Sequence, residues 1–431
     1  MTRSIFDKRY DVAIVGAGIV GCSTAYFLAQ KGLNVIVCDR GAVGAEQSSR
    51  AWGFIRKQGR DPAELPLAEA AIEIWDNITE RYGAQSTHRA KAGILMPAET
   101  DADEKIIQES YQSAQQLGIK SEILTSGQLS EMLPKLRGGW RCALFTPSDG
   151  HADPAASVQT FHKAALENGV DFATELTVIG LPAQGANVSG VLTSRGMIHA
   201  DHVVIASGIG SRKLLGQLGY NAPIQTIRSS AVETAPAEQF TDIAMWCPKV
   251  SFRPNRDGSF VVGNGYRNVR TNHDLTLESL TNLRYFLPAI LQNRDQLKIT
   301  LGAEMLRSLT NKVSRGKAFD PLQEPQVDRQ KTELNLAEFN RLFPEIGPLE
   351  KARQWAGRID ITPDLLPIID KLNAHENAYV ACGFSGYGFA VGPAVGQQLS
   401  EWIATGSSRL DLTKFRHARF SEGAFEVAKA V

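Results

Sequence analysis

Three glycines near the N-terminus have the spacing that the pyrophosphate of a dinucleotide requires. Gly16, Gly18 and Gly21 form a Gly-x-Gly-x-x-Gly pattern directly after the mostly apolar residues 10–15. The first glycine permits a tight turn, the second lets the backbone approach the phosphates, and the third allows close packing of a helix on a strand. The amides at the start of the following helix would then hold the pyrophosphate.

The elements around these glycines are in the order that such a site needs. Residues 9–15 predict a strand, the apolar positions at 25 and 27–29 continue a helix, and Gly32 suits the C-terminal cap of that helix. The next apolar run, 33–38, ends at Asp39, where a βαβ unit delivers a carboxylate to the ribose hydroxyls of an adenosine. We therefore predict dinucleotide binding over residues 9–40 rather than a purely structural turn.

The composition of the chain limits which kinds of molecule it is expected to bind. The chain has 431 residues, with 46 Lys plus Arg and 46 Asp plus Glu, so no charged field favours nucleic acid. The five cysteines form no Cys-x-x-Cys pair, which favours a reduced compartment. Because we find neither a signal peptide nor a run of about 18 apolar residues, we expect a cytoplasmic protein without a transmembrane segment. We expect a small-molecule substrate, and we also consider a homodimer.

The pattern along the chain predicts two interleaved domains. Alternating helices and strands recur up to about residue 208, whereas 222–265 reads as antiparallel strands with a turn at 254–258. The expected fold class is α/β, with a Rossmann-type dinucleotide-binding domain and an inserted, mostly antiparallel substrate domain of α+β character. We assign 1–90, 140–221 and 350–431 to the first domain, and 91–139 and 222–349 to the second.

Three further glycine-rich or polar segments follow predicted strands, at 48–53, 206–208 and 383–389. A simple nicotinamide enzyme needs no such second cluster at the redox ring of its cofactor. In the last segment and its helix, Gly388, Gly392 and Gly396 recur every four residues, which lets a flat ring or another backbone approach closely. The N-terminus of that helix carries free amides and the positive end of the helix dipole, which suit a negatively charged group, although a packing helix is the alternative interpretation.

With these segments, the sequence resembles the D-amino acid oxidase superfamily of FAD enzymes over nearly its whole length. The resemblance is carried by the glycine pattern and by the segments 149–154, 200–208, 362–367 and 383–389. It implies FAD as the cofactor. Some members bind FAD covalently through a cysteine or a histidine, but this chain has Gly357 and Arg50 at the matching positions, so we expect non-covalent FAD.

The glycine pattern and the resemblance together give a set of expected cofactor-binding residues. They are Gly16, Gly18, Ile19, Val20, Asp39, Arg40, Ser48, Ser49, Arg50, Ala51, Val178, Ser207, Gly208, Gly357, Gly383, Gly386, Tyr387, Gly388 and Phe389.

An α-amino acid substrate needs a group that grips its carboxylate, and arginine does this through paired hydrogen bonds. Near the predicted cleft lie Arg56, Arg228, Arg253 and Arg358. Arg56 resembles a carboxylate-binding arginine of sarcosine oxidase, and Arg253, inside a predicted strand, needs either an acidic partner or the substrate. Our candidates for the catalytic site are Arg56, Arg253 and Arg358, with Trp355 and Tyr387 as aromatic walls.

The resemblance implies oxidation of an α-amino acid by hydride transfer to flavin N5, giving a 2-oxo acid and ammonia, with oxygen or another acceptor taking the electrons. The segment 47–61 most resembles oxidases and deaminases that act on L-amino acids, so we favour an L-amino acid oxidase. The alternatives are a D-amino acid dehydrogenase and a secondary-amine oxidase of the sarcosine or opine type, including a subunit of a hetero-oligomer. A nicotinamide dehydrogenase is a third interpretation and predicts a colourless protein.

Overall fold

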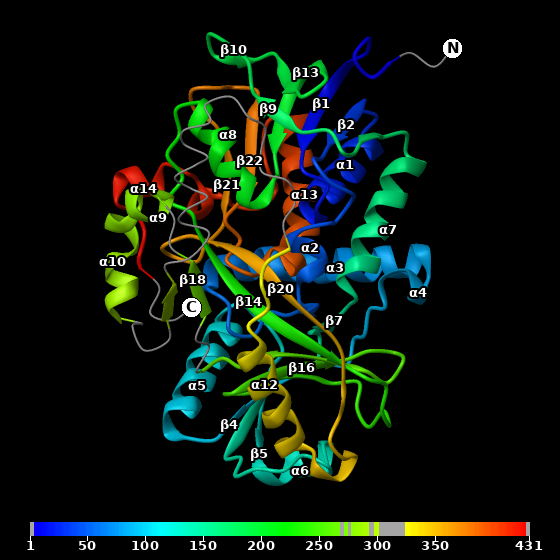
Figure 1. The fold of residues 1–431 in the computed structure, drawn as a ribbon, viewed down its shortest axis with the longest axis vertical. Coiled ribbons are helices and arrows are strands. Elements are labelled where there is room, and N and C mark those ends of the chain that lie inside the picture. The colour runs from blue at the N-terminus through cyan, green and yellow to red at the C-terminus, as the bar shows by residue number, and fades with distance from the viewer. Residues whose placement is uncertain (1–3, 268–270, 275–276, 293–296, 301–323, 428–431) are drawn as a thin grey trace.

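The computed structural model describes residues 4–267, 271–274, 277–292, 297–300 and 324–427. In these residues two large sheets lie at opposite ends of the molecule, with a layer of helices at their junction (Figure 1). The mixed α/β architecture agrees with the predicted fold class.

The first sheet begins with the predicted βαβ unit. β1 (Arg9–Val15) pairs in parallel with β2 (Val35–Cys38), and α1 (Ile19–Gln30) connects them. The full order of this eight-stranded sheet is β21-β22-β13-β1-β2-β8, and β12 and β9 extend it beside β13. The bounds of these further strands are Ile368–Lys371 (β21), Ala378–Cys382 (β22), Gly196–Ile205 (β13), Asp171–Ala173 (β8), Gly190–Thr193 (β12) and Val178–Gly180 (β9).

Helices cover the first sheet because its strands are apolar on both faces. α1 packs against α13 (Gly388–Thr405) and α7 (Pro154–Glu167), and α13 packs against α3 (Leu65–Tyr82). Gly396 permits the close contact between α13 and α1, since a Cβ on Gly396 would lie 2.7 Å from the backbone nitrogen of Thr24. The glycine stripe of α13 is therefore a packing surface. α8 (Ser211–Gln217) follows β13.

The second sheet is mostly antiparallel, as predicted. Its order is β19-β18-β14-β17-β16-β15-β4-β6-β5, and β20 also pairs with β14. Its strands are β4 (Ile94–Ala98), β5 (Glu122–Thr125), β6 (Cys142–Thr146), β14 (Gln225–Thr234), β15 (Ala244–Trp246), β16 (Val250–Pro254), β17 (Phe260–Asn264), β18 (Thr271–Asp274), β19 (Leu297–Thr300) and β20 (Lys351–Ile361). The predicted boundaries at 140 and 350 place β6 and β20 in the cofactor domain, whereas both strands pair within this second sheet.

Two helices flank the second sheet. α12 (Arg329–Leu342) packs on β14, β16 and β17, where Phe252, Phe260, Phe339 and Phe343 form a buried aromatic cluster. α5 (Asp101–Gln116) packs on β4 and β6. After α5 the chain forms β5, which pairs with β6, and then α6 (Ser126–Met132).

The remaining elements are short. Two small ribbons pair β3 (Phe54–Ile55) with β7 (Gly150–His151) and β10 (Ala183–Gln184) with β11 (Asn187–Val188). The other α-helices are α2 (Gln47–Arg50), α4 (Ala84–Thr87), α9 (Leu277–Thr281), α10 (Leu283–Gln292) and α14 (Arg419–Glu422). In the described part of the chain, no helix is both long and apolar enough to cross a membrane.

Candidate active site

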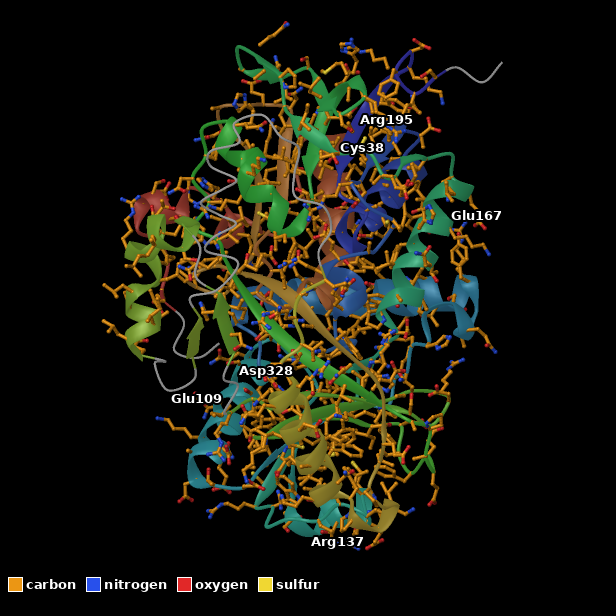
Figure 2. The ribbon with its side chains drawn as sticks, viewed as in Figure 1. Cys38, Glu109, Arg137, Glu167, Arg195 and Asp328 are labelled. Carbon is orange, nitrogen blue, oxygen red and sulfur yellow. The ribbon has the colours of Figure 1, made fainter. Side chains whose placement is uncertain are left out.

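A cavity of about 830 Å³ runs between the two sheets. Cys38, at the end of β2, lines one end, and Glu109, on α5, lies at the other; Figure 2 labels both. A volume of this size falls in the range that small-molecule and cofactor sites occupy. The first sheet supplies the glycine-rich end of the cavity, and the second sheet supplies an aromatic and polar end.

The glycine-rich end has the backbone geometry that a pyrophosphate requires. Gly16 has φ +113°, and a Cβ on Gly21 would lie 1.8 Å from the carbonyl oxygen of Gly16. A Cβ on Gly18 would lie 2.9 Å from the Oγ of Ser48, which accepts a hydrogen bond from the amide of Ile19 at 3.0 Å. These contacts leave room for a ligand against the backbone and exclude larger side chains.

Asp39 lies beside this glycine turn. Its carboxylate accepts hydrogen bonds from the amides of Ala17 (2.6 Å) and Gly41 (2.8 Å), and the residue lines the cavity. Burial raises the pKa of Asp39, and the two amides oppose this shift because they stabilise the charged form. The carboxylate is therefore positioned at the end of β2, where an adenosine ribose is expected.

Most of the predicted cofactor residues line the cavity. Those that do are Gly16, Gly18, Ile19, Val20, Asp39, Arg40, Ser48, Arg50, Ala51, Val178, Ser207, Gly208, Gly357, Gly386, Tyr387, Gly388 and Phe389. Ser49 and Gly383 are not among the lining residues: the Ser49 hydroxyl donates to the carbonyl of Glu46, and the Gly383 amide donates to the buried carboxylate of Asp360. The polar groups of both residues therefore bind other protein groups and are not directed into the cavity.

The two positions at which related enzymes attach FAD covalently face each other here. A Cβ on Gly357 would lie 3.2 Å from the Cβ of Arg50, and both residues line the cavity. Neither glycine nor arginine carries the thiol or imidazole that such a bond uses. Arg50 instead forms two hydrogen bonds with the carboxylate of Glu324, at 2.5 and 2.6 Å.

The cavity matches FAD in its hydrogen-bond donors as well as in its volume. α13 begins at Gly388, and its N-cap residue, Tyr387, makes no capping hydrogen bond through its side chain. The first amides of this long helix therefore face the cavity at Gly388 and Phe389. They would stabilise negative charge on a reduced isoalloxazine, while the glycine turn after β1 would hold the pyrophosphate.

At the other end of the cavity, the buried cation Arg56 lines the wall. Its guanidinium lies 3.8 Å from the centroid of the Trp246 ring and 5.2 Å from that of Tyr387. It also donates to the carbonyl oxygen of Gln58. Burial lowers the pKa of Arg56, and Tyr387 and Asp149 partly oppose this shift. A guanidinium stays charged in proteins, so the cavity presents a desolvated positive charge on an aromatic surface.

Asp149 fixes the loop that carries Arg56. The carboxylate of Asp149 is fully buried and accepts hydrogen bonds from the amides of Lys57 (2.9 Å) and Gln58 (3.2 Å). Burial raises the pKa of Asp149 to about 6. Sequence reasoning placed Asp149 in a family motif but did not predict this tether, which connects the loop at 149 to the loop at 56–60.

The other predicted substrate residues are placed differently. Arg358 lines the cavity, but Arg253 and Trp355 are not among the lining residues. The Arg253 Nε donates to the carbonyl of Trp52 at 2.6 Å and its Nη2 lies 3.9 Å from Asp153, so its charge has protein partners. The indole of Trp355 donates to the carbonyl of Arg50 at 3.0 Å, which makes Trp355 a support for α2.

Among the lining residues that sequence reasoning missed at this end of the cavity are Arg60, Glu64, Trp246 and Tyr266. The sequence does contain one signal for two of these residues. Arg56, Arg60 and Glu64 are spaced four residues apart, a spacing that places charged side chains next to one another along one side of a helix. Trp246 and Tyr266 carry no local signal, because the Trp246 ring meets Arg56 and the Tyr266 ring only through the fold; the centroids of the two rings are 5.7 Å apart.

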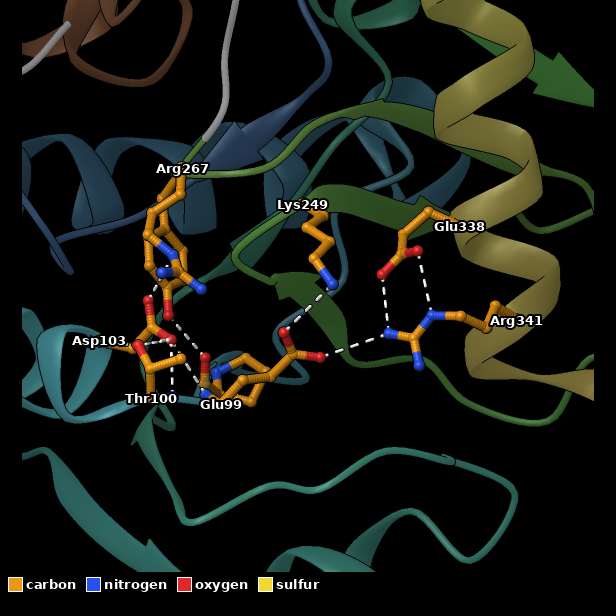
Figure 3. Close-up of polar contacts among 9 residues, drawn as sticks. Glu99, Thr100, Asp103, Lys249, Arg267, Glu338 and Arg341 are labelled. Carbon is orange, nitrogen blue, oxygen red and sulfur yellow. Dashed lines mark hydrogen bonds and ion pairs between the residues drawn. The ribbon is translucent and has the colours of Figure 1, made fainter. Parts of the chain in front are cut away.

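α5 forms part of the cavity wall and is anchored at its N-terminus. Asp103, completely buried, accepts a hydrogen bond from the amide of Thr100 at 2.9 Å and forms an ion pair with Arg267 at 2.7 Å. Figure 3 shows this pair between Asp103 and Arg267. Arg267 directly follows the lining residue Tyr266, so the pair restrains the chain next to the aromatic wall.

A second set of ion pairs extends this anchor to α12. Glu99 pairs with Lys249 at 3.5 Å and with Arg341 at 3.3 Å, and Arg341 also pairs with Glu338 at 2.7 Å (Figure 3). The network links β4, the turn before β16, and α12. It therefore connects the end of β4, next to α5, to α12 on the second sheet.

The fold and the cavity define a flavoprotein oxidoreductase. The family model described as FAD dependent oxidoreductase, abbreviated DAO, matches residues 11–402. The chain therefore belongs to the DAO family and is an FAD-dependent enzyme, which confirms the resemblance, the cofactor and the enzyme class predicted from the sequence.

Relatives in the family share about a quarter of their residues with this chain. It is 27% identical to the sarcosine oxidase subunit beta of Arthrobacter sp over 425 residues, covering 96% of this chain and 92% of that protein. It is also 27% identical to the N-methyl-L-tryptophan oxidase of Yersinia pestis (strain Pestoides F), covering 95% and 99%.

Solved structures share the fold. The L-amino acid deaminase from Proteus myxofaciens, in complex with anthranilate, has a TM-score of 0.89 at 23% identity and covers 97% of this chain and 95% of that chain. The glycine oxidase from Geobacillus kaustophilus has a TM-score of 0.77 at 19% identity and covers 95% and 99%.

Proposed function

We propose that this protein oxidises the carbon–nitrogen bond of an α-amino acid whose carboxylate binds Arg56. The observation that carries this proposal is the Arg56 guanidinium, buried at the substrate end of the cavity and stacked 3.8 Å from the Trp246 ring centroid. A desolvated guanidinium next to an open cavity favours a small organic anion, and a carboxylate matches its paired donors.

FAD, when bound, supplies the chemistry of accepting a hydride from the α-carbon. The protein contributes binding, orientation and exclusion of water. Arg56 sets the position of the carboxylate, Tyr387 connects that position to the N-terminus of α13, and the walls of Trp246 and Tyr266 exclude water. The α-carbon is thereby directed toward the flavin end of the cavity.

We favour an L-amino acid with a primary amine, which would yield a 2-oxo acid and ammonia after hydrolysis of the imino acid. A second candidate is an N-methyl amino acid, which the names of the relatives, sarcosine oxidase subunit beta and N-methyl-L-tryptophan oxidase, support equally. Oxygen or another acceptor would then reoxidise the flavin. A D-amino acid dehydrogenase and a subunit of a hetero-oligomer remain alternatives.

Anaerobic mixing tests this function. The purified yellow protein is mixed with L-amino acids, D-amino acids, sarcosine and N-methyl-L-tryptophan, and the oxidised flavin absorbance is followed. Bleaching by one class identifies the substrate and its handedness, and admission of air shows whether oxygen is the acceptor. A protein that holds FAD but bleaches with none of these compounds contradicts the proposal.

A further inference from the structure

Two buried charged residues lie in the substrate end of the cavity without a role in the function proposed above. Arg60 and Glu64 line the cavity, and their side chains are only 1% and 2% exposed. The Nη1 of Arg60 lies 3.6 Å from the Oε1 of Glu64, which is an ion pair but longer than a hydrogen bond.

The carboxylate of Glu64 forms no hydrogen bond with the part of the chain that the structure describes, and its Oε1 is a buried acceptor without a donor. Asp149, which is equally buried, accepts two backbone amides instead. A buried carboxylate without donors is costly, so natural structures normally supply them. Glu64 thus has one long ion pair with Arg60, at 3.6 Å, where Asp149 has two backbone donors.

The surroundings of Glu64 place it next to the proposed carboxylate site. The guanidinium of Arg60 lies 4.5 Å from the Tyr387 ring centroid, and its Nε donates to the carbonyl of Arg56 at 2.7 Å. Tyr387 is thus shared by Arg56 and Arg60. An α-amino acid carries its ammonium group two bonds from its carboxylate carbon, so a negative group beside Arg56 complements it.

We propose that Glu64 binds the ammonium group of the substrate and accepts its proton. This inference rests on the proposed function, because it needs an amine substrate. In the step, an N–H bond of the ammonium breaks and an O–H bond forms on Glu64, while the electron pair stays on nitrogen. The step changes no oxidation state, and it leaves the neutral amine, whose lone pair stabilises the α-carbon when its hydrogen departs with two electrons.

The charged residues around Glu64 favour this proton transfer. Burial raises the pKa of Glu64 to about 7, the nearby Asp61 also raises it, and Arg60 and Arg56 lower it. A general base is most effective when its pKa is close to the working pH. Because the protonated carboxyl cannot accept a second proton, the rate of flavin reduction should fall as the pH decreases through about 7.

The test compares Glu64→Gln with the wild type in anaerobic rapid mixing between pH 5.5 and 10. The probe is whichever compound of the panel above reduces the wild-type flavin fastest. We expect the pH profile of the variant to lack the fall in rate near pH 7. At pH 7 its flavin should be reduced about 10²-fold or more slowly than that of the wild type, and the rate should increase only at higher pH, as the free amine of the substrate forms. Glu167→Gln is the matched control, because Glu167 is solvent exposed at the end of α7 and is not among the residues that line the cavity; its profile should match the wild type.

A binding measurement separates this role from a structural one. Propionate, a carboxylate without an amino group, is titrated against each variant through the change in the flavin spectrum. Glu64→Gln should bind propionate within about twofold of the wild type and retain its FAD. Glu64→Asp, which keeps the carboxylate, should restore part of the rate and the limb near neutral pH.

Three results would overturn the inference. If Glu64→Gln keeps the wild-type pH profile, Glu64 accepts no proton, although the proposed function stands. If propionate binding and FAD retention fall as much as the rate in both Glu64 variants, Glu64 is structural. If no amine reduces the wild-type flavin, the proposed function fails and the role of Glu64 fails with it.

Discussion

The guanidinium of Arg56 lies over the ring of Trp246, a residue of the second sheet, with 3.8 Å between the guanidinium carbon and the ring centroid. This contact joins the loop after β3 to β15 and fixes where a substrate carboxylate would bind. Replacing Arg56 with Met should raise KM for the amino acid by about 30-fold or more, since loss of a buried charge pair costs roughly 2–5 kcal/mol.

Steady-state kinetics and propionate titration check this prediction. Arg56→Lys should recover part of the affinity, because it keeps the charge but not the paired donors. Arg137→Met serves as a control, since Arg137 lies on the surface far from the cavity (Figure 2). An unchanged KM in Arg56→Met would place the carboxylate elsewhere, with Arg358 as the next candidate.

The two tryptophans near the site should differ in their effect. Trp246→Leu removes the surface under Arg56 and should raise KM by about 2- to 30-fold, the range for a contact of roughly 0.5–2 kcal/mol. Trp355→Leu should leave KM nearly unchanged, because Trp355 supports α2 through the carbonyl of Arg50 rather than lining the cavity. The opposite order of effects would restore Trp355 as the substrate wall.

The cofactor should leave the denatured protein. Gly357 and Arg50 occupy the positions at which related enzymes attach FAD covalently, and neither can form such a bond. Precipitation of the holoenzyme with acid should therefore give a colourless pellet and a yellow supernatant, measured by absorbance and by mass spectrometry of the intact chain. A pellet that keeps the flavin, or a mass increased by one FAD, contradicts this expectation.

Asp149 should make stability depend on pH between 4 and 6. Burial raises its pKa from an ordinary value near 4 to about 6, so the folded protein holds a proton that the unfolded chain releases in this interval. The contribution of Asp149 to stability is thus present below pH 4 and decreases as the pH rises to 6, by roughly 3 kcal/mol.

Asp149→Asn removes this titration, so the difference in unfolding free energy, wild type minus variant, should fall across pH 4–6. Urea unfolding at each pH measures that difference. Because Asn keeps one acceptor for the amides of Lys57 and Gln58, the variant should also bind propionate several-fold more weakly. Asp101→Asn, on the surface, is the control; a constant difference across the interval would contradict the role of Asp149.

Several features follow directly from the sequence because neighbouring residues decide them. Glycines at 16, 18 and 21, an apolar strand before them and an acid at the end of the next strand specify a βαβ unit, since φ +113° at Gly16 and the tight contact of Gly21 exclude other residues. The same local logic predicted Gly32, which has φ +82° just after α1.

The substrate site could not be predicted without the tertiary structure. Arg56, Trp246 and Tyr387 are far apart in the chain, and only the pairing of β15 with β4 and the packing of α13 bring their side chains together. Likewise Arg253 looked available for a substrate until the fold placed the carbonyl of Trp52 at its Nε. Backbone conformation and phosphate-binding turns depend on adjacent residues and can be predicted from spacing. The partner that a buried charge receives depends on which distant strands and helices meet, and residue spacing does not specify that.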